Sequence, residues 1–275
     1  MASKKIASSM IKFIVLTVLL ILFIVPFVFL LINSFKENIA ITSNPLSLPE
    51  SFNMTNYMNA FDKMNYITAF TNSLVITVLS VLFISLFAAM TAHYFVRNNT
   101  KFNQYTFMLM VASMIIPFQA IMIPLVKIYG SLDLLNSKWS LIYMYIGFGS
   151  SLAVFIYHGF VKSIPKELEE AALIDGCTRI QTFFRIVFPV LMPTTATISI
   201  LNVLWIWNDF LLPSLILVDP EQRTLPLSTY NFYGTYTVDY GPLMASLVLT
   251  IFPIIIIYLF AQKYIIQGVM QGSIK

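Results

Sequence analysis

The densest group of charged side chains in this sequence lies in residues 163–176, which read Ser-Ile-Pro-Lys-Glu-Leu-Glu-Glu-Ala-Ala-Leu-Ile-Asp-Gly. Pro165 suits a first helical turn, three glutamates complement the positive end of the helix dipole, and Gly176 suits a left-handed stop. We therefore expect a short helix. Side chains at three- and four-residue spacings share one narrow face of it, namely Leu168, Ala171, Ala172 and Asp175.

Two uses of such a helix are open from its periodicity alone. It could lie on a lipid surface as an amphipathic connector, or its small side chains could enter a groove of another protein. Lipid-facing helices usually carry bulky apolar residues and a polar face rich in Lys and Arg. This helix is acidic with alanines, which favours a protein groove.

Residues for catalysis or metal binding are lacking elsewhere in the sequence. His93 and His158 have no carboxylate or cysteine at ligand spacing, and Cys177 is the single cysteine. No G-x-x-x-x-G-K-[ST] phosphate loop is present, so ATP and its Mg²⁺ would have to bind another polypeptide. We predict no catalytic residue, no metal site and no cofactor in this chain. A net charge of +4 without a basic patch also gives no support for a nucleic-acid partner.

The elements that position the segment 163–176 are predicted to be membrane helices. The 275 residues are 58% hydrophobic and 10% charged, whereas soluble domains carry about 25% charged residues. A span needs about 20 apolar residues. Six stretches meet or approach that length: Phe13–Ser34, Phe70–Phe95, Tyr105–Val126, Ser140–Val161, Ile186–Asn208 and Pro242–Gln262. The fold class is therefore all-α, a polytopic membrane protein with six transmembrane helices and a short additional helix.

The first stretch could instead be a cleaved signal peptide, because lysines precede it. Its uncharged run is longer than a usual signal core, and no A-x-A-like site follows Ser34, so we predict a retained anchor. Both termini are predicted in the cytoplasm, since Lys and Arg accumulate there. That orientation leaves five of the 16 basic residues outside: Lys36, Lys63, Lys127, Lys138 and Arg223. Two polar outer segments, 35–69 and 209–241, could hold short surface helices.

Carboxylates that would couple transport to protons or sodium are missing from the six stretches. An ion-coupled carrier or channel is therefore disfavoured. A membrane-embedded enzyme is disfavoured as well, because no clustered catalytic constellation is found.

One motif carries a resemblance. Glu170-Ala-Ala-Leu-Ile-Asp-Gly176, then nine residues, then Ile186-Val-Phe-Pro189, resembles the EAA motif of membrane subunits of bacterial ABC importers. The likeness extends to carbohydrate-importer permeases, especially the smaller subunit of maltose-type and multiple-sugar systems. Matching stretches include residues 72–74, 116–119, 207–210 and 240–245, although family members often have Glu at Asp209 and Trp at Tyr240.

The resemblance implies one permease domain over residues 1–275, with residues 1–12 and 263–275 cytoplasmic and 163–176 as a coupling helix. Its partners would be a second homologous permease, two ATPase subunits, an extracytoplasmic sugar-binding protein, a sugar and the lipid of the bacterial plasma membrane. The implied coupling residues are Glu170, Ala171, Ala172, Asp175 and Gly176. The tail 271–275 would also reach the ATPases. A permease for peptides or amino acids remains an alternative.

Sugars are usually held by hydrogen bonds and by stacking on aromatic rings. Candidates for a substrate pathway are Tyr143, Tyr145, Asn202, Trp205 and Asn208. Tryptophans near the outer ends are equally explained by an interfacial belt, and Asn202 by a bond between helices. In similar importers the segment 209–241 faces the binding protein, so contacts are expected from Tyr230, Tyr233 and Tyr236.

Overall fold

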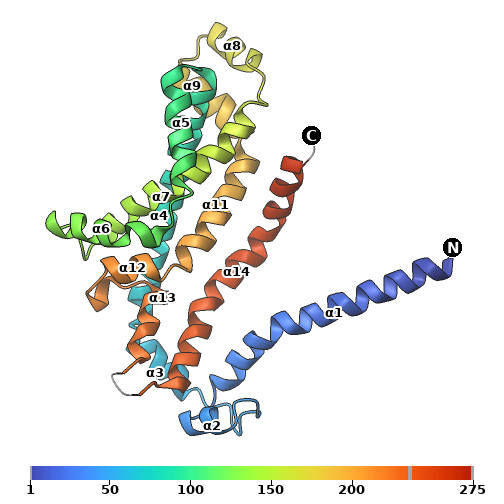
Figure 1. The fold of residues 1–275 in the computed structure, drawn as a ribbon, viewed down its shortest axis with the longest axis vertical. Coiled ribbons are helices and arrows are strands. Elements are labelled where there is room, and N and C mark those ends of the chain that lie inside the picture. The colour runs from blue at the N-terminus through green and yellow to red at the C-terminus, as the bar shows by residue number, and fades with distance from the viewer. Residues whose placement is uncertain (1, 235–236, 274–275) are drawn as a thin grey trace. The chain divides into compact units, whose positions relative to one another are not determined.

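The computed structural model describes the backbone of residues 2–234 and 237–273. It describes the side chains of these residues except those of residues 2–8, 261 and 263–273. The described chain is helical apart from an isolated antiparallel bridge between Tyr233 and Val238 (Figure 1). Its contacts form two compact units, the first made of residues 1–66 and 228–253, the second of 67–227 and 254–275.

The first unit holds α1 (Ala2–Asn33), α2 (Asn38–Ser43), α3 (Thr55–Lys63), the 3₁₀ helix η3 (Thr229–Phe232) and the beginning of α14 (Tyr240–Ser273). The apolar side chains of α1, such as Phe13 and Phe23, are exposed within the chain, which suits a helix surrounded by lipid or by another subunit. The first predicted span therefore has the length and the apolar surface that crossing a membrane requires.

Hydrogen bonds between residues distant in sequence hold the loops of this first unit. The Asn56 amide donates to the carbonyls of Ser34 and Lys36 at 2.9 and 2.8 Å, and the backbone N–H of Gly241 donates to Asn38 Oδ1 at 2.8 Å. A Cβ on Gly241 would lie 2.8 Å from the Asn56 amide, so only glycine fits this close approach. The short helices α2 and α3 confirm the expectation for the segment 35–69.

The second unit contains the remaining helices. They are α4 (Tyr66–Arg97), α5 (Lys101–Ser113), α6 (Phe118–Ser131), α7 (Lys138–Val161), α8 (Glu167–Ile174), α9 (Arg179–Thr182), the π-helix η1 (Phe183–Val187), α10 (Phe188–Val190), α11 (Met192–Trp207), α12 (Leu211–Ile216), the 3₁₀ helix η2 (Pro220–Gln222) and α13 (Leu225–Ser228). Within the unit, α8 and α9 lie at one end and α12 lies toward the other (Figure 1).

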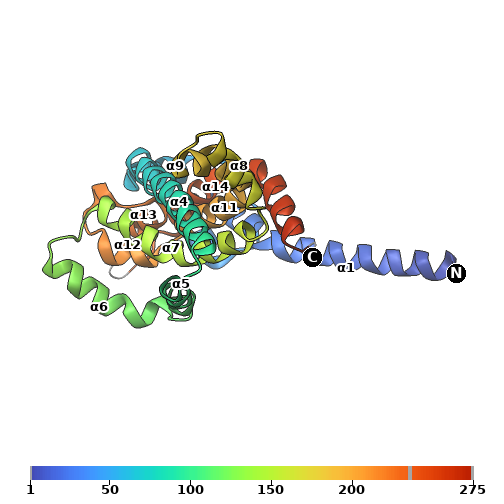
Figure 2. The same ribbon diagram turned by 90° about the horizontal axis from the view of Figure 1, so that it is seen from above.

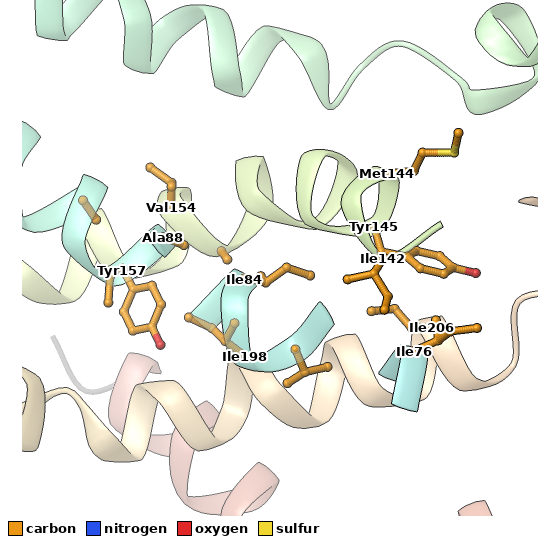
Figure 3. Close-up of a cluster of buried hydrophobic side chains, with 14 of the residues drawn as sticks. Ile76, Ile84, Ala88, Ile142, Met144, Tyr145, Val154, Tyr157, Ile198 and Ile206 are labelled. Atoms are coloured by element: carbon orange, nitrogen blue, oxygen red, sulfur yellow. The ribbon is translucent and has the colours of Figure 1, made fainter. Parts of the chain in front are cut away.

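The core of the second unit is formed where α4, α7 and α11 meet (Figure 3). Small residues of α4, among them Ala88 and Ala92, allow close helix approach, as in other membrane bundles. On α7, a Cβ added to Gly149 would lie 2.6 Å from Ile84 Cδ1 and 2.9 Å from Asn202 Oδ1. Gly149 therefore allows α7 to approach both α4 and α11 closely.

Two of the six predicted spans are broken rather than straight. Helices α5 and α6 make an angle of 103° (Figure 2), and Arg179–Val190 meets Met192–Trp207 at 75°. Hydropathy does not reveal these bends, so the stretches Tyr105–Val126 and Ile186–Asn208 count as spans only if each bent pair is one span. Proline explains both breaks, because Pro117 immediately precedes α6, and Pro193 is the second residue of α11.

The other four predicted spans are confirmed as helices long and apolar enough to cross a membrane. Their apolar parts are Ser9–Asn33, Tyr66–Arg97, Lys138–Val161 and Tyr240–Phe260. The described chain thus has four candidate spans, or six when each bent pair counts as one. The segment 209–241 also holds the short helices that its sequence suggested.

Candidate functional site

The predicted short helix exists as α8, and its end is specified by Gly176. Gly176 has φ +88°, its N–H donates to Leu173 O at 3.1 Å, and the N–H of Cys177 donates to Ala172 O at 3.0 Å. This pair of bonds is a Schellman motif, which requires a left-handed residue after the helix. The expected stop at Gly176 is confirmed. Pro165, by contrast, precedes the first helical residue by two positions, so its placement in the first turn was wrong.

The exposed surface of α8 differs from the predicted narrow face. Ala172 is only 6% exposed and turns toward its own chain, whereas Glu170, Ala171, Asp175 and Gly176 are exposed. Ile174, which is not part of the predicted face, is 85% exposed at the tip of the helix. An apolar side chain so exposed beside carboxylates is suited to a protein contact.

Glu169 is held by two basic side chains of α4, and we call this group, His93, Arg97 and Glu169, the Glu169 cluster. Glu169 Oε2 lies 2.9 Å from His93 Nε2, and Glu169 Oε1 lies 2.7 Å from Arg97 Nε and 2.6 Å from Arg97 Nη2. His93 and Arg97 are four residues apart, so one face of α4 presents both. The sequence pattern around His93 does not reveal this carboxylate, because Glu169 follows His93 by 76 residues.

The surroundings of Glu169 favour its ionised form. Burial alone would raise the pKa of Glu169, but hydrogen bonds from Arg97 and His93, together with their charges, outweigh burial and lower this pKa. A carboxylate paired in this way remains charged at neutral pH. A cavity of about 570 Å³ adjoins the cluster and is lined by residues of α4, α8, α9 and η1, including Tyr94, Lys166 and Arg179.

The chain between α8 and the fifth span begins with a capping box. Thr178 Oγ1 accepts from the N–H of Gln181, and the Gln181 side chain accepts from the N–H of Thr178. The π-helix η1 follows at once, and its buried Phe183 places its ring centroid 5.5 Å from that of His93. π-Helical turns are frequent at functional sites.

The structure brings two of the predicted substrate-pathway residues, Tyr145 and Trp205, into contact. Tyr145 is fully buried, donates to Asp209 Oδ2 at 2.8 Å, and meets the Trp205 ring edge-on at 5.5 Å between centroids. Trp205 itself is 42% exposed. Asp209, which was not among the predicted pathway residues, therefore joins Tyr145 and Trp205 at the end of α11.

Asp209 lies beyond the last residue of α11, and burial raises its pKa. The Tyr145 hydroxyl and the backbone N–H groups of Leu212, Leu211 and Phe210 offset part of this effect. The carboxylate is thus held by neutral donors.

The other pathway candidates make different contacts. Tyr143 is 68% exposed and lines a cavity of about 590 Å³ bordered by α5, α6 and α7. Asn202 is buried and donates to Ile198 O of its own helix at 2.9 Å, and Asn208 is exposed and donates to Leu204 O at 2.8 Å. The bond from Asn202 is therefore within one helix, not between two as one interpretation held.

The structure describes two of the three tyrosines that are expected to contact the binding protein. Tyr230 and Tyr233 are exposed, with rings stacked at 5.6 Å between centroids. Tyr236 lies outside the described residues, as do Ile274 and Lys275 of the predicted tail contact. Among the described residues, no group of three or more His, Cys, Asp or Glu side chains is arranged to hold a metal ion.

Known proteins similar in sequence to this chain match it over nearly its whole length. The chain is 44% identical over 258 residues to the probable starch degradation products transport system permease protein AmyC of Thermoanaerobacterium thermosulfurigenes, with 94% of each chain covered. It is 40% identical over 268 residues to the multiple sugar-binding transport system permease protein MsmG of Streptococcus mutans, with 96% of each covered.

A solved structure supports the fold alone. It is described as the crystal structure of a bacterial ABC transporter involved in the import of the acidic polysaccharide alginate, and it matches with a TM-score of 0.80 at 21% identity. The match covers 93% of this chain and 95% of that one.

Residues 81–271 match the family described as binding-protein-dependent transport system inner membrane component. This match includes α8 and the helices that position it, and it confirms the resemblance that the EAA motif carried. The chain therefore belongs to this family of multi-pass inner-membrane proteins, the permease subunits of ABC importers, in which partner subunits hydrolyse the ATP.

Proposed function

We propose that this permease imports an oligosaccharide delivered by an extracytoplasmic binding protein. The observation that carries the proposal is the agreement among relatives that cover nearly the whole chain. AmyC is named for starch degradation products, MsmG for multiple sugars, and MelC of Bacillus subtilis, 33% identical, for melibiose, raffinose and stachyose. The exposed rings of Tyr143 and Trp205 are suited to stacking on sugars.

The working assembly contains this chain as one permease domain, a second homologous permease, two ATPase subunits and the sugar-binding protein. ATP and Mg²⁺ bind the ATPases, and this chain carries no cofactor of its own. Tyr230, Tyr233 and Tyr236 contact the binding protein. Tyr145, Asn202 and Asn208 serve the pathway mainly by shaping the helices around it.

Both termini and α8 lie in the cytoplasm. The excess of Lys and Arg on that side supports this orientation. Contact between Glu169 and Arg97 places α8 on the same membrane side as the end of α4. The ATPases can then reach α8.

The exposed residues Glu170, Ala171, Asp175 and Gly176 dock in a cleft of an ATPase, and the tail 271–275 touches the ATPase pair. Ala172 supports the helix from its buried side instead of entering the cleft. Closing of the ATPases on ATP would then move α8 and, with it, the spans in an alternating-access cycle.

The experiment is uptake and ATP hydrolysis by the complete complex in proteoliposomes, with the binding protein added. The panel contains maltotriose, raffinose and, as a control from another substrate class, a tripeptide. We expect one or both sugars to drive uptake and to raise ATP hydrolysis, and the tripeptide to do neither. Uptake of the tripeptide alone would overturn the sugar assignment in favour of a peptide permease.

A further inference from the structure

α8 is attached to its own subunit by few polar side-chain contacts. Glu167, Glu170 and Asp175 are exposed, and in the described part of the chain both ion pairs end on Glu169. Glu169 is 13% exposed, and His93 and Arg97 are 19% and 14% exposed. The Glu169 cluster is therefore a sheltered charged link between α8 and α4.

The link also reaches the two segments that flank α8. Arg97 Nη2 donates to the carbonyl of Ile164, in the loop before α8, at 2.9 Å. The His93 ring lies against Phe183, in the π-helix after α8. Charge-assisted hydrogen bonds are shorter and more directional than neutral ones. A displacement of α8 therefore acts on the end of α4 through several fixed contacts at once.

α4 is suited to carry such a displacement across the protein. It is one helix of 32 residues, and its buried residues from Ile76 to Ala92 belong to one hydrophobic cluster with residues of α7 and α11. Because packed helices have discrete arrangements and do not deform continuously, a shift at Arg97 is passed to the core as a rigid movement.

We propose that Glu169 is a positioning residue that transmits the movement of α8 into α4 through His93 and Arg97. This inference rests on the proposed role of α8 in coupling, and it assigns to Glu169 a task distinct from docking. The exposed residues of α8 receive the ATPase, whereas the sheltered glutamate ties the helix to the span.

The test compares Glu169→Gln with Glu167→Gln in the complete complex. Both changes remove one negative charge from the first turn of α8, but Glu167 is exposed and belongs to neither the cluster nor the docking residues. The measured quantities are the amount of ATPase that co-purifies, the rate of ATP hydrolysis, and the molecules of maltotriose or raffinose taken up per ATP hydrolysed.

With Glu169→Gln we expect normal co-purification, continued hydrolysis and about tenfold less uptake per ATP. Glu167→Gln should match the wild type in all three. Arg97→Gln should resemble Glu169→Gln, and the double variant should be no worse than either single variant, because the two side chains act as one unit. An unchanged uptake per ATP in Glu169→Gln would overturn the proposal. Loss of the ATPases from that variant would also overturn it, since Glu169 would then be a docking residue.

A second measurement does not depend on the substrate. Cys177, the single cysteine, is replaced by Ser, and a cysteine is introduced for exposed Thr71, near the other end of α4. We expect ATP with vanadate to change the rate of maleimide labelling at this position, and Glu169→Gln to abolish that change. If the wild-type complex takes up neither sugar, the substrate proposal fails. The labelling experiment then tests the proposed role of Glu169 separately. If the change in labelling rate persists in Glu169→Gln, the proposal for Glu169 is overturned.

Discussion

Glu169 and Asp209 are both partly buried carboxylates beside a long helix of the second unit, but their hydrogen-bond partners differ. Glu169 is paired with His93 and Arg97, which lower its pKa. Asp209 accepts from the Tyr145 hydroxyl and from backbone N–H groups, and burial raises its pKa. One carboxylate is stabilised as an anion, and the other is held at some cost in its charged form.

This difference indicates different tasks at the two ends of the unit. A charged pair with sheltered partners loses much of its stabilisation if one member moves away, because the remaining charge is left uncompensated. The Glu169 cluster is therefore suited to keep two moving parts together. The neutral hydrogen bonds of Asp209 fix the chain between α11 and α12 without linking the movement of separate helices by charge.

The largest effect is expected from the end of α8. Gly176→Val should reduce ATP-driven uptake more than tenfold, because a left-handed conformation costs an ordinary L-residue about 1–2 kcal/mol, and a β-branched side chain raises that cost. The measurement is uptake by complexes normalised for inserted permease.

Gly176→Asn is the matched variant, since asparagine tolerates the left-handed conformation. A Cβ at this position meets no atom within 4 Å, so steric overlap within the chain does not confuse the comparison. Asparagine should retain most of the uptake. Equal activity of the valine and asparagine variants would show that the Schellman end of α8 is unimportant for coupling.

The next effect concerns stability at the other carboxylate. Tyr145→Phe removes the hydroxyl that donates to Asp209 and should destabilise the complex by about 1–3 kcal/mol, the usual cost of a lost hydrogen bond to a charged group. Thermal unfolding in detergent measures it. Asp209→Asn should cost less than about 1 kcal/mol, because it removes a charge that burial disfavours. A larger loss in the asparagine variant than in the phenylalanine variant would contradict this account of Asp209.

The sequence made the short helix predictable but not its inward contact. Glu170, Ala171, Asp175 and Gly176 could be found because a glycine stop and a spaced motif are local features. Glu169 could not be distinguished from its acidic neighbours, because its partners on α4 are 72 and 76 residues away in sequence. Only the packing of α4 beside α8 selects it.

The fold shows the same division between local and distant information. Apolar length identified the straight spans to within a few residues, whereas the 103° and 75° bends depend on how prolines and their neighbours pack. Tyr143 and Tyr145 were both candidates as aromatic residues in one span. Being two residues apart on a helix, they point in different directions, and only the bundle decides which is buried.

A smaller effect is the opposite response of the two carboxylates to pH. The pKa of Glu169 lies below its usual value of 4.5, so its contribution to stability is present above about pH 4.5 and is lost as the pH falls through the lowered pKa. The pKa of Asp209 lies above its usual value of 3.8, so its cost is absent below that pH and develops as the pH rises through the raised pKa. Thermal unfolding across this range is compared for the wild type, Glu169→Gln and Asp209→Asn.

The stability of the wild type relative to Asp209→Asn should increase as the pH falls from neutral toward 3.8. The deficit of Glu169→Gln should persist until the pH falls below about 4.5 and then shrink. Parallel pH profiles for all three proteins would rule out the contrast between the two sites.

The smallest effects are expected at two exposed rings, Trp205 near Asp209 and Tyr143 in the cavity bordered by α5, α6 and α7. Trp205→Ala and Tyr143→Ala remove exposed side chains, so thermal unfolding should change by less than about 1 kcal/mol. If these rings stack on the sugar, each loss should raise the sugar concentration for half-maximal uptake about threefold, with hydrolysis per sugar unchanged. This pattern separates a pathway residue, which changes affinity, from Glu169, whose loss changes uptake per ATP. A Trp205→Ala variant with normal affinity and lower uptake per ATP would place Trp205 with the coupling elements instead.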